Sequence, residues 1–236
     1  MKILTLDTAE QSCSIALVED RVLISETFNL NKMTHSKTVM EMIAHTFENS
    51  AGIKIGDLDG FVVSCGPGSF TGLRIGISVI KGLAFATSKP SAGISTLDAI
   101  GYQFIFSSIP VCVMMDAKRG EVYSAIYNFN NGRLIQKSEE IVVSPEIALS
   151  NLANINECLF IGSGAVVFRE LIKKSMGDKA LFAPPFQNCV KASVLANIVF
   201  DNTQRLSLLP DAITPVYLRR SDAEMGNSVN VKKIVA

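Results

Sequence analysis

The fold of this 236-residue chain is decided by one stretch, Gly66-Pro67-Gly68-Ser69-Phe70-Thr71-Gly72-Leu73-Arg74-Ile75-Gly76. The compact apolar run 59–65 before it has the composition of a buried strand, and the apolar residues after it predict a long helix that continues to about Thr87. Glycine permits the tight backbone that joins a strand directly to a helix. The stretch therefore predicts one strand, turn and helix unit of an α/β protein.

On the N-terminal side, apolar alternation predicts a three-stranded meander, and a segment with helical spacing follows it. The strands are expected at 2–7, 13–19 and 21–28, and the helix carries its apolar residues at Met40, Ile43, Ala44 and Phe47. A short strand at 90–94 follows the glycine-turn helix. The first part of the chain thus has strands in mixed directions, as α/β proteins with a meander do.

The same order of elements begins again at Val111. Strands are expected at 111–116, 121–129 and 133–143, then a strand at 159–162, the turn Gly162-Ser163-Gly164, a helix at 166–174 and helical spacing at 193–201. Such repetition predicts two related lobes.

The predicted boundaries follow from this repetition. The first lobe covers residues 1–105 and is joined by a closing segment at 210–221, and the second lobe covers 106–209. Residues 222–236 lack sustained apolar periodicity, and we expect them to be mobile.

Composition excludes several classes of function. Lys plus Arg and Asp plus Glu are equal at 22 each, so the chain lacks the positive field that holds a nucleic-acid backbone. Asp7 interrupts the first apolar run too early for a signal peptide, the five cysteines form no C-x-x-C pair, and the apolar stretch 75–87 is too short for a membrane span. We expect a cytoplasmic protein that does not enter the membrane.

The glycine stretch admits two interpretations. The N–H groups at the start of its helix could bind an anion, although the stretch matches neither the Walker pattern nor G-x-G-x-x-G; alternatively it only turns the chain. Asp7, at the end of the first strand, could organise a magnesium ion or bond the next turn. Gly72 and Gly76 lie one helical turn apart, so this stripe could face the chain's own sheet or a partner helix.

Hydrolytic and metal chemistry lack a motif. His35 and His45 are ten residues apart and neither belongs to an H-x-x-x-H pair, and there is no G-x-S-x-G elbow. Hydrolase chemistry is therefore unsupported by the residues, and the histidines form no metal-binding pair.

Five segments together resemble one family in the same order along the chain. They are 2–9, 13–17, 66–76, Asp116-Ala117-Lys118-Arg119-Gly120-Glu121-Val122-Tyr123 and Pro215-Val216-Tyr217-Leu218-Arg219. By these motifs the chain resembles the TsaB (YeaZ) family. The resemblance implies two ribonuclease H-like lobes of the actin, Hsp70 and sugar-kinase (ASKHA) fold.

The resemblance also implies where the functional residues lie. In that fold a nucleotide would meet the cleft between the lobes at Asp7, Gly66, Gly68, Ser69, Gly162 and Gly164. A partner would dock on the first-lobe helices, at Val39, Met40, Ile43, Phe47, Phe70, Gly72, Leu73, Gly76, Ile77, Ile80 and Leu83.

By resemblance, that partner is TsaD, the related transferase that makes N6-threonylcarbamoyladenosine at position 37 of tRNAs reading codons that start with A. TsaD holds a metal with a His-x-x-x-His pair, and the matching positions here are Thr96 and Ile100. The chain is therefore expected to be a non-catalytic subunit that needs no cofactor of its own. The ATPase TsaE would join the assembly, ATP or ADP could bind the assembled complex, and tRNA would be reached only through it.

Three alternatives stay open at this point. The isolated chain could form a homodimer. It could be an autonomous ATPase or sugar-kinase-like enzyme, although we identify no second phosphate-binding acid after either glycine turn. A peptidase is disfavoured because neither a metal pair nor a nucleophile motif is present.

Overall fold

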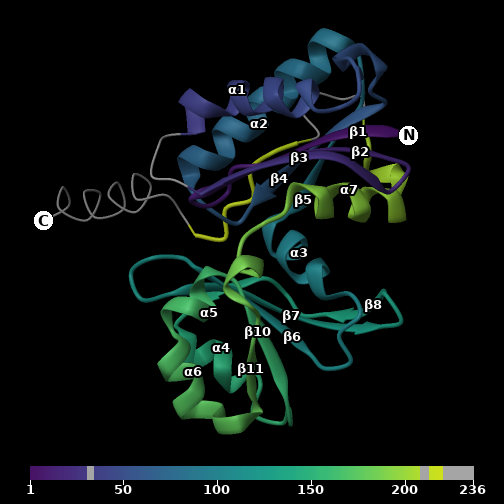
Figure 1. Cartoon of the computed structure of the whole chain (residues 1–236). Helices are drawn as coiled ribbons and strands as arrows, with labels where there is room; N and C mark the ends of the chain where they lie inside the picture. The colour runs from purple at the N-terminus through teal and green to yellow at the C-terminus, as the bar shows by residue number, and fades with distance from the viewer. Residues whose placement is uncertain (31–34, 208–212, 220–236) are drawn as a thin grey trace, which may run out of the picture.

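The computed structural model describes residues 1–30, 35–207 and 213–219, which form two lobes that each contain one β-sheet (Figure 1). The predicted tail at 222–236 and both ends of the closing segment 210–221 lie outside the described residues. The two-lobed α/β prediction is confirmed by the presence of two separate sheets.

The first sheet has five strands in the order β3-β2-β1-β4-β5. Strands β1, β2 and β3 are antiparallel, whereas β4 runs parallel to β1 and β5 runs parallel to β4. The strand bounds are β1 Lys2–Asp7, β2 Ser12–Glu19, β3 Val22–Leu30, β4 Gly60–Gly66 and β5 Ser91–Ser95. The predicted meander and the predicted glycine-turn strand therefore share one sheet.

The second sheet repeats this arrangement in the order β11-β10-β6-β7-β8, with β9 paired to β7. Its meander is antiparallel, and β10 and β11 extend it in parallel on the other side of β6. The bounds are β6 Val111–Asp116, β7 Val122–Asn130, β8 Arg133–Lys137, β9 Ile141–Val143, β10 Cys158–Ile161 and β11 Ala180–Phe182. The internal repeat in the sequence thus corresponds to two sheets of the same topology.

Helices cover the sheets as Figure 1 shows, with α1 and α2 together on the outer side of the first sheet and α4, α5 and α6 on the second lobe. Helix α3 lies between the two sheets. The bounds are α1 His35–Glu48, α2 Phe70–Thr87, α3 Thr96–Gly101, α4 Pro145–Ser150, α5 Ser163–Val167, α6 Arg169–Met176 and α7 Ala192–Asp201. Short 3-10 turns lie at 55–57, 102–104, 177–179, 185–187 and 203–205.

Helix α7 corrects the predicted lobe boundary. The sequence assigned all of 106–209 to the second lobe, but α7 packs on β1 and β2 of the first sheet. Ala192 and Ala196 contact Ala16 there, and Thr5 Oγ1 donates a hydrogen bond to the carbonyl of Ala192 at 2.7 Å. Small side chains on both surfaces allow this close approach, and apolar periodicity does not reveal which sheet a helix will cover.

The two lobes share one apolar core. It includes Ile3 and Val62 from the first sheet, Val113 and Tyr127 from the second, and Leu195 from α7, all fully buried. Because side chains from both sheets and from α3 and α7 pack in one cluster, moving one lobe against the other would expose apolar surface to water.

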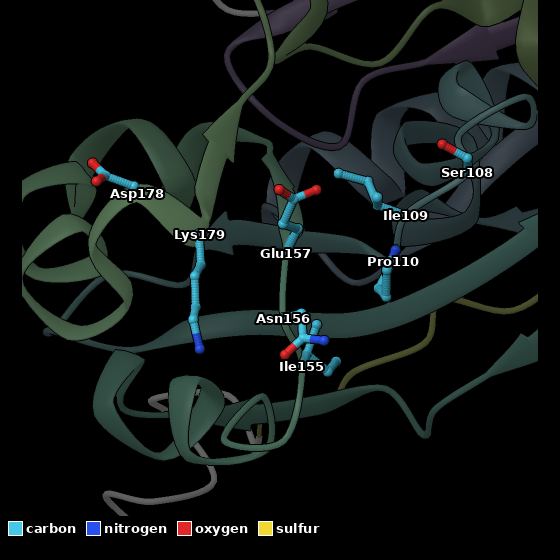
Figure 2. Close-up of a pocket in the computed structure, with 8 residues that line it drawn as sticks. All are labelled: Ser108, Ile109, Pro110, Ile155, Asn156, Glu157, Asp178 and Lys179. Carbon is cyan, nitrogen blue, oxygen red and sulfur yellow. The ribbon is translucent and has the colours of Figure 1, made fainter.

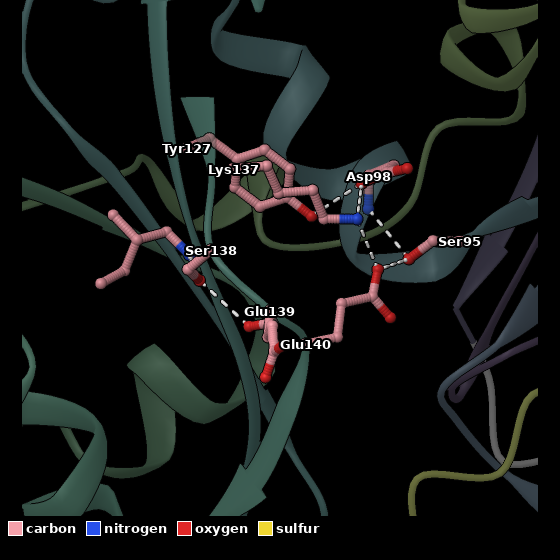
Figure 3. Close-up of polar contacts among 8 residues, drawn as sticks. Ser95, Asp98, Tyr127, Lys137, Ser138, Glu139 and Glu140 are labelled. Carbon is pink, nitrogen blue, oxygen red and sulfur yellow. Dashed lines mark hydrogen bonds and ion pairs between the residues drawn. The ribbon is translucent and has the colours of Figure 1, made fainter. Parts of the chain in front are cut away.

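A polar network lies at the same junction, where α3 faces the second sheet (Figure 3). Lys137 Nζ lies 2.6 Å from Asp98 Oδ1 and 2.7 Å from Glu140 Oε1. The Tyr127 hydroxyl donates to Asp98 Oδ1 at 2.9 Å, and the Ser95 hydroxyl donates to Glu140. These contacts join the end of β5 and the start of α3 to β7, β8 and the chain before β9.

Helix α2 is longer than the apolar stretch considered in the sequence. With 18 residues, it is long and apolar enough to cross a membrane by length and composition alone. Its packing is that of a core helix, because Leu73, Ile77 and Ile80 are buried against the first sheet. Ser69 caps its start by accepting from the N–H of Gly72 at 3.3 Å.

Candidate functional site

The carboxyl ends of β1 and β4 in the first sheet and of β6 and β10 in the second lie near one another at the junction of the lobes, and this region is called the cleft below. In open α/β sheets, ligands bind beyond the carboxyl ends of the parallel strands. Asp7 ends β1 and Asp116 ends β6, and the two glycine turns at 66–69 and 162–164 follow β4 and β10. The turn between β1 and β2 contacts both glycine turns, through Ala9 and Glu10.

The first glycine turn is filled by this protein's own backbone. The N–H of Ser69 donates to the carbonyl of Ala9 at 2.7 Å. A Cβ placed on Gly68 would overlap Ala9, and one on Gly66 would overlap the carbonyl of Val216. The glycines are needed because neighbouring backbone lies against them, which supports the turn interpretation over the anion-binding one.

The second glycine turn is packed in the same way. A Cβ on Gly162 or Gly164 would overlap the backbone at Met114 of β6. The N–H of Gly162 donates to Asn188 Oδ1 at 2.9 Å, and Asn188 is buried. This N–H is therefore already satisfied by a side chain.

Glu10 crosses the cleft and links the two lobes. Its carboxylate accepts a hydrogen bond from the hydroxyl of Ser163, and that hydroxyl accepts one from the N–H of Asp116 at 3.0 Å. The pKa of Glu10 is raised from 4.5 to about 7, mainly by burial and also by the charges of Asp7 and Asp116, while the hydrogen bond from Ser163 opposes this rise. The sequence analysis missed Glu10, although its position three residues after Asp7 in the same turn was visible.

Asp7 is fully buried beneath this link. Its Oδ1 accepts hydrogen bonds from the Ser64 hydroxyl and from the N–H of Ala9, whereas Oδ2 has no partner among the described residues. Burial raises the pKa of Asp7 from 3.8 to about 6, opposed by the Ser64 and Ala9 hydrogen bonds. The side chain holds the turn that Thr8 and Ala9 form.

The charges of the cleft oppose a phosphate ligand. Asp7, Glu10 and Asp116 contribute three carboxyl groups, and Lys118 pairs with Asp116 at 2.6 Å. A phosphate entering here would meet like charge and would have to displace Glu10 from Ser163. Glu10, Ser163 and Asp116 bind one another in this region.

The two positions that the sequence analysis compared with a His-x-x-x-His pair lie within α3. Thr96 and Ile100 are both fully buried, and Ile100 belongs to the shared core. Across residues 1–30, 35–207 and 213–219, no group of three or more His, Cys, Asp or Glu side chains could hold a metal ion.

A second candidate site is a groove of about 490 Å³ between α1 and α2. It is lined by Ser36, Val39, Met40, Phe70, Thr71, Arg74, Ile75, Ser78 and Val79. Met40 is 54% exposed and Phe70 is 40% exposed, which is unusual for such large apolar side chains. Of the residues predicted to meet a partner, Val39, Met40 and Phe70 line this groove.

Most of the remaining predicted interface residues are buried within the chain itself. Gly72 and Gly76 do not face outward, because a Cβ on either would overlap Thr8 of this same chain. Leu73 and Ile80 are fully buried, and Ile43 and Ile77 are each 5% exposed. Phe47 and Leu83 are half-buried around the first-lobe core.

The predicted stripe of α2 is buried because of where its residues lie around the helix axis. The glycine stripe 72, 76 and the apolar positions 73, 77 and 80 face the sheet, whereas 71, 74, 75, 78 and 79 face the groove. Neighbouring positions on a helix are about 100° apart, so the stripe chosen from the sequence lies on the inner side.

A larger pocket than this groove lies elsewhere, with a volume of about 630 Å³ (Figure 2). Its lining residues are Ser108, Ile109, Pro110, Ile155, Asn156, Glu157, Asp178 and Lys179. They directly precede β6, β10 and β11, at the amino ends of these parallel strands. This is the edge opposite to the one where such sheets bind ligands, and no predicted site residue lines it.

Two lobes with the same strand order, whose carboxyl strand ends meet at a shared cleft, define a protein of the actin, Hsp70 and sugar-kinase (ASKHA) class. Comparison with known proteins places the chain within it. The family described as "TsaD: tRNA N6-adenosine threonylcarbamoyltransferase" matches residues 29–226.

Relatives named "tRNA threonylcarbamoyladenosine biosynthesis protein TsaB" match most of the chain. The Bacillus subtilis protein is 29% identical, covering 95% of this chain and 96% of its own length, and the Escherichia coli protein is 30% identical, covering 94% and 96%. The solved structure of YeaZ from Pseudomonas aeruginosa superposes with a TM-score of 0.76 at 26% identity, covering 92% of this chain and 99% of its own. The chain belongs to the tRNA N6-adenosine threonylcarbamoyltransferase family and, within it, to the TsaB (YeaZ) group.

Proposed function

We propose that this chain acts in the biosynthesis of threonylcarbamoyladenosine on tRNA as the non-catalytic subunit that binds and supports TsaD. The observation that carries the proposal is the contrast between a cleft closed by its own side chains and an open apolar groove on the first lobe. The TsaB relatives named above support the pathway.

The groove between α1 and α2 suits a helical partner. Met40 and Phe70 offer exposed apolar area at its two walls, and Arg74 and Thr71 supply a polar margin. Interfaces commonly combine buried apolar anchors with a polar rim, so this composition favours a protein partner over a small molecule. In the proposed assembly TsaD occupies the groove, TsaE joins the complex, and tRNA is reached through TsaD. A second copy of this chain is the competing occupant when TsaD is absent.

The lack of catalysis is supported by the contents of the cleft. Glu10 bonds Ser163 in the space between the glycine turns, and the carboxyl groups beside it disfavour a nucleotide phosphate. Thr96 and Ile100 stand at the positions of the metal pair in the transferase and cannot replace imidazole ligands. These features argue against an autonomous ATPase or sugar kinase.

A binding titration tests the proposal. Met40→Asp should weaken association with TsaD at least tenfold, equivalent to about 1.4 kcal/mol, because a charge would be buried in the apolar groove. Since Met40 is half exposed in the free chain, the variant should fold normally.

The matched control is Ile135→Asp, which changes an exposed apolar residue on β8, an element that does not line the groove. It should bind TsaD as the unaltered chain does. Equal affinity of the Met40→Asp variant and the unaltered chain would refute the groove as the docking site. ATP hydrolysis by the purified chain alone would refute the non-catalytic role.

A further inference from the structure

The closing segment Ile213–Arg219 contacts both lobes. Ile213 is buried in the first-lobe core, and the N–H of Val216 donates to the carbonyl of Cys65 at the end of β4, at 2.7 Å. Arg219 reaches the second lobe, where it donates to the carbonyl of Ala117 at 2.8 Å and pairs with Glu121. In Figure 1 the segment is the yellow trace at the junction of the lobes.

At its first-lobe end, the segment builds part of the groove wall. The ring of Tyr217 stacks on Phe70 with centroids 5.1 Å apart, and the guanidinium of Arg74 lies 3.8 Å above the Phe70 ring. Arg74 Nε also donates to the Tyr217 hydroxyl at 3.1 Å. Because Phe70 and Arg74 line the groove, an occupant that moves them must also move Tyr217.

At its second-lobe end, the segment holds a strained hairpin. Lys118 and Arg119 have φ angles of 63° and 56°, and Gly120 has 77°, so two residues with side chains adopt a conformation that such residues rarely take. Asp116 Oδ1 accepts a hydrogen bond from the N–H of Lys118 at 2.8 Å, and the guanidinium of Arg219 donates one to the backbone carbonyl of Ala117. Strained backbone persists only where its surroundings hold it.

This hairpin also borders the cleft. Asp116 begins it, and the N–H of Asp116 donates to Ser163, the residue that Glu10 binds. A single chain of contacts therefore runs from the groove wall through Tyr217 and Arg219 to the link between the lobes.

We propose that residues 213–219 form a strap that couples occupation of the α1–α2 groove to the conformation of the 116–121 hairpin, with Arg219 as the anchoring residue. The coupling rests on the proposed function, because it requires TsaD in the groove. The strap makes the second lobe responsive to a partner that contacts only the first lobe.

Hydrogen exchange measured by mass spectrometry tests the strap on the full chain, alone and with saturating TsaD. In the free chain, Arg219→Ala should accelerate hydrogen exchange of amides 117–121 at least fivefold, because the hairpin loses the contacts of Arg219 with Ala117 and Glu121. Arg133→Ala, which removes an arginine from β8, should leave these amides unchanged. Arg219→Lys keeps the charge and should give an intermediate rate, and it serves if the alanine variant does not fold.

Addition of TsaD should change hairpin exchange at least fivefold in the unaltered chain and in Arg133→Ala, but not in Arg219→Ala, whose affinity for TsaD should stay within about threefold. Unchanged hairpin exchange in free Arg219→Ala overturns the anchor. The coupling is overturned if bound TsaD changes hairpin exchange in Arg219→Ala, or if it does not change hairpin exchange in the unaltered chain. Either result leaves the docking proposal intact. Failure of the unaltered chain to bind TsaD overturns the docking proposal instead.

Discussion

The cleft between the lobes and the groove between α1 and α2 differ in what fills them. In the cleft, Glu10, Ser163 and Asp116 bind one another, and the glycine turns lie against neighbouring backbone. In the groove, Met40 and Phe70 stay exposed. The cleft side chains are engaged with one another except at Asp7 Oδ2, which lacks a partner among the described residues, whereas the groove leaves apolar surface exposed on the outside of the first lobe.

The largest expected effect separates the two faces of α2. Gly76→Leu should lower the free energy of unfolding by about 3 kcal/mol or more, because the side chain would overlap Thr8 and Val63 in the packed interior. Ser78→Leu, on the groove face of the same helix, should change stability by less than about 0.5 kcal/mol. Chemical denaturation of both variants measures this. Equal stability would mean that the glycine stripe is not packed internally.

The next effect probes the burial of charge beneath the cleft. The pKa of Asp7 is raised to about 6 in the folded chain, so its contribution to stability is complete below pH 3.8 and is lost as the pH rises through about 6. Asp7→Asn keeps an oxygen that accepts from Ser64 and Ala9 but carries no charge. As the pH rises from 4 to 8, the free energy of unfolding of Asp7→Asn should increase relative to that of the unaltered chain by about 2 to 3 kcal/mol.

Urea unfolding at several pH values between 4 and 8 measures this gain, and TsaD affinity should not change, since Asp7 does not line the groove. A stability difference between the two chains that does not vary with pH would show that burial does not raise the pKa of Asp7 in the folded chain. Loss of TsaD binding in this variant would favour a role for the cleft over the groove.

The smallest effect concerns the junction that joins the lobes. Lys137→Met keeps most of the side-chain length but leaves Asp98 and Glu140 without their cation, at a cost of about 1 to 2 kcal/mol at pH 7.5. Lys173→Met, which removes an exposed pair with Glu170 on α6, is the control and should cost less than about 0.5 kcal/mol. Thermal unfolding of both variants at pH 7.5 measures the difference, and equal costs would show that the network does not stabilise the packing of the lobes.

Local patterns predicted most of the elements well. The turn at 66–69 and the helix that follows it lie where the glycine stretch predicts them, and the two meanders form in the predicted order. The predicted strand 133–143 is instead two short strands, β8 and β9, which both pair with β7. Alternation of apolar residues indicates extended chain but does not reveal where pairing is interrupted.

The candidate sites were less predictable. Ala9 and Glu10, in the turn that follows Asp7, contact the two glycine turns, but Glu10 carried no motif. Arg74 belongs to the quoted glycine stretch and Tyr217 and Arg219 to the quoted closing motif, yet their contacts join parts of the chain more than 100 residues apart. No local spacing encodes such contacts.

The sequence by itself determined the class of fold, the repeated lobes and the family, because these depend on apolar periodicity, glycine positions and ordered motifs that act over short distances. Only the tertiary structure decided which face of α2 is free, which lobe receives α7, and what occupies the cleft. These outcomes depend on close packing between distant segments, where a single Cβ against Thr8 or a carboxylate beside Ser163 decides which surface stays open.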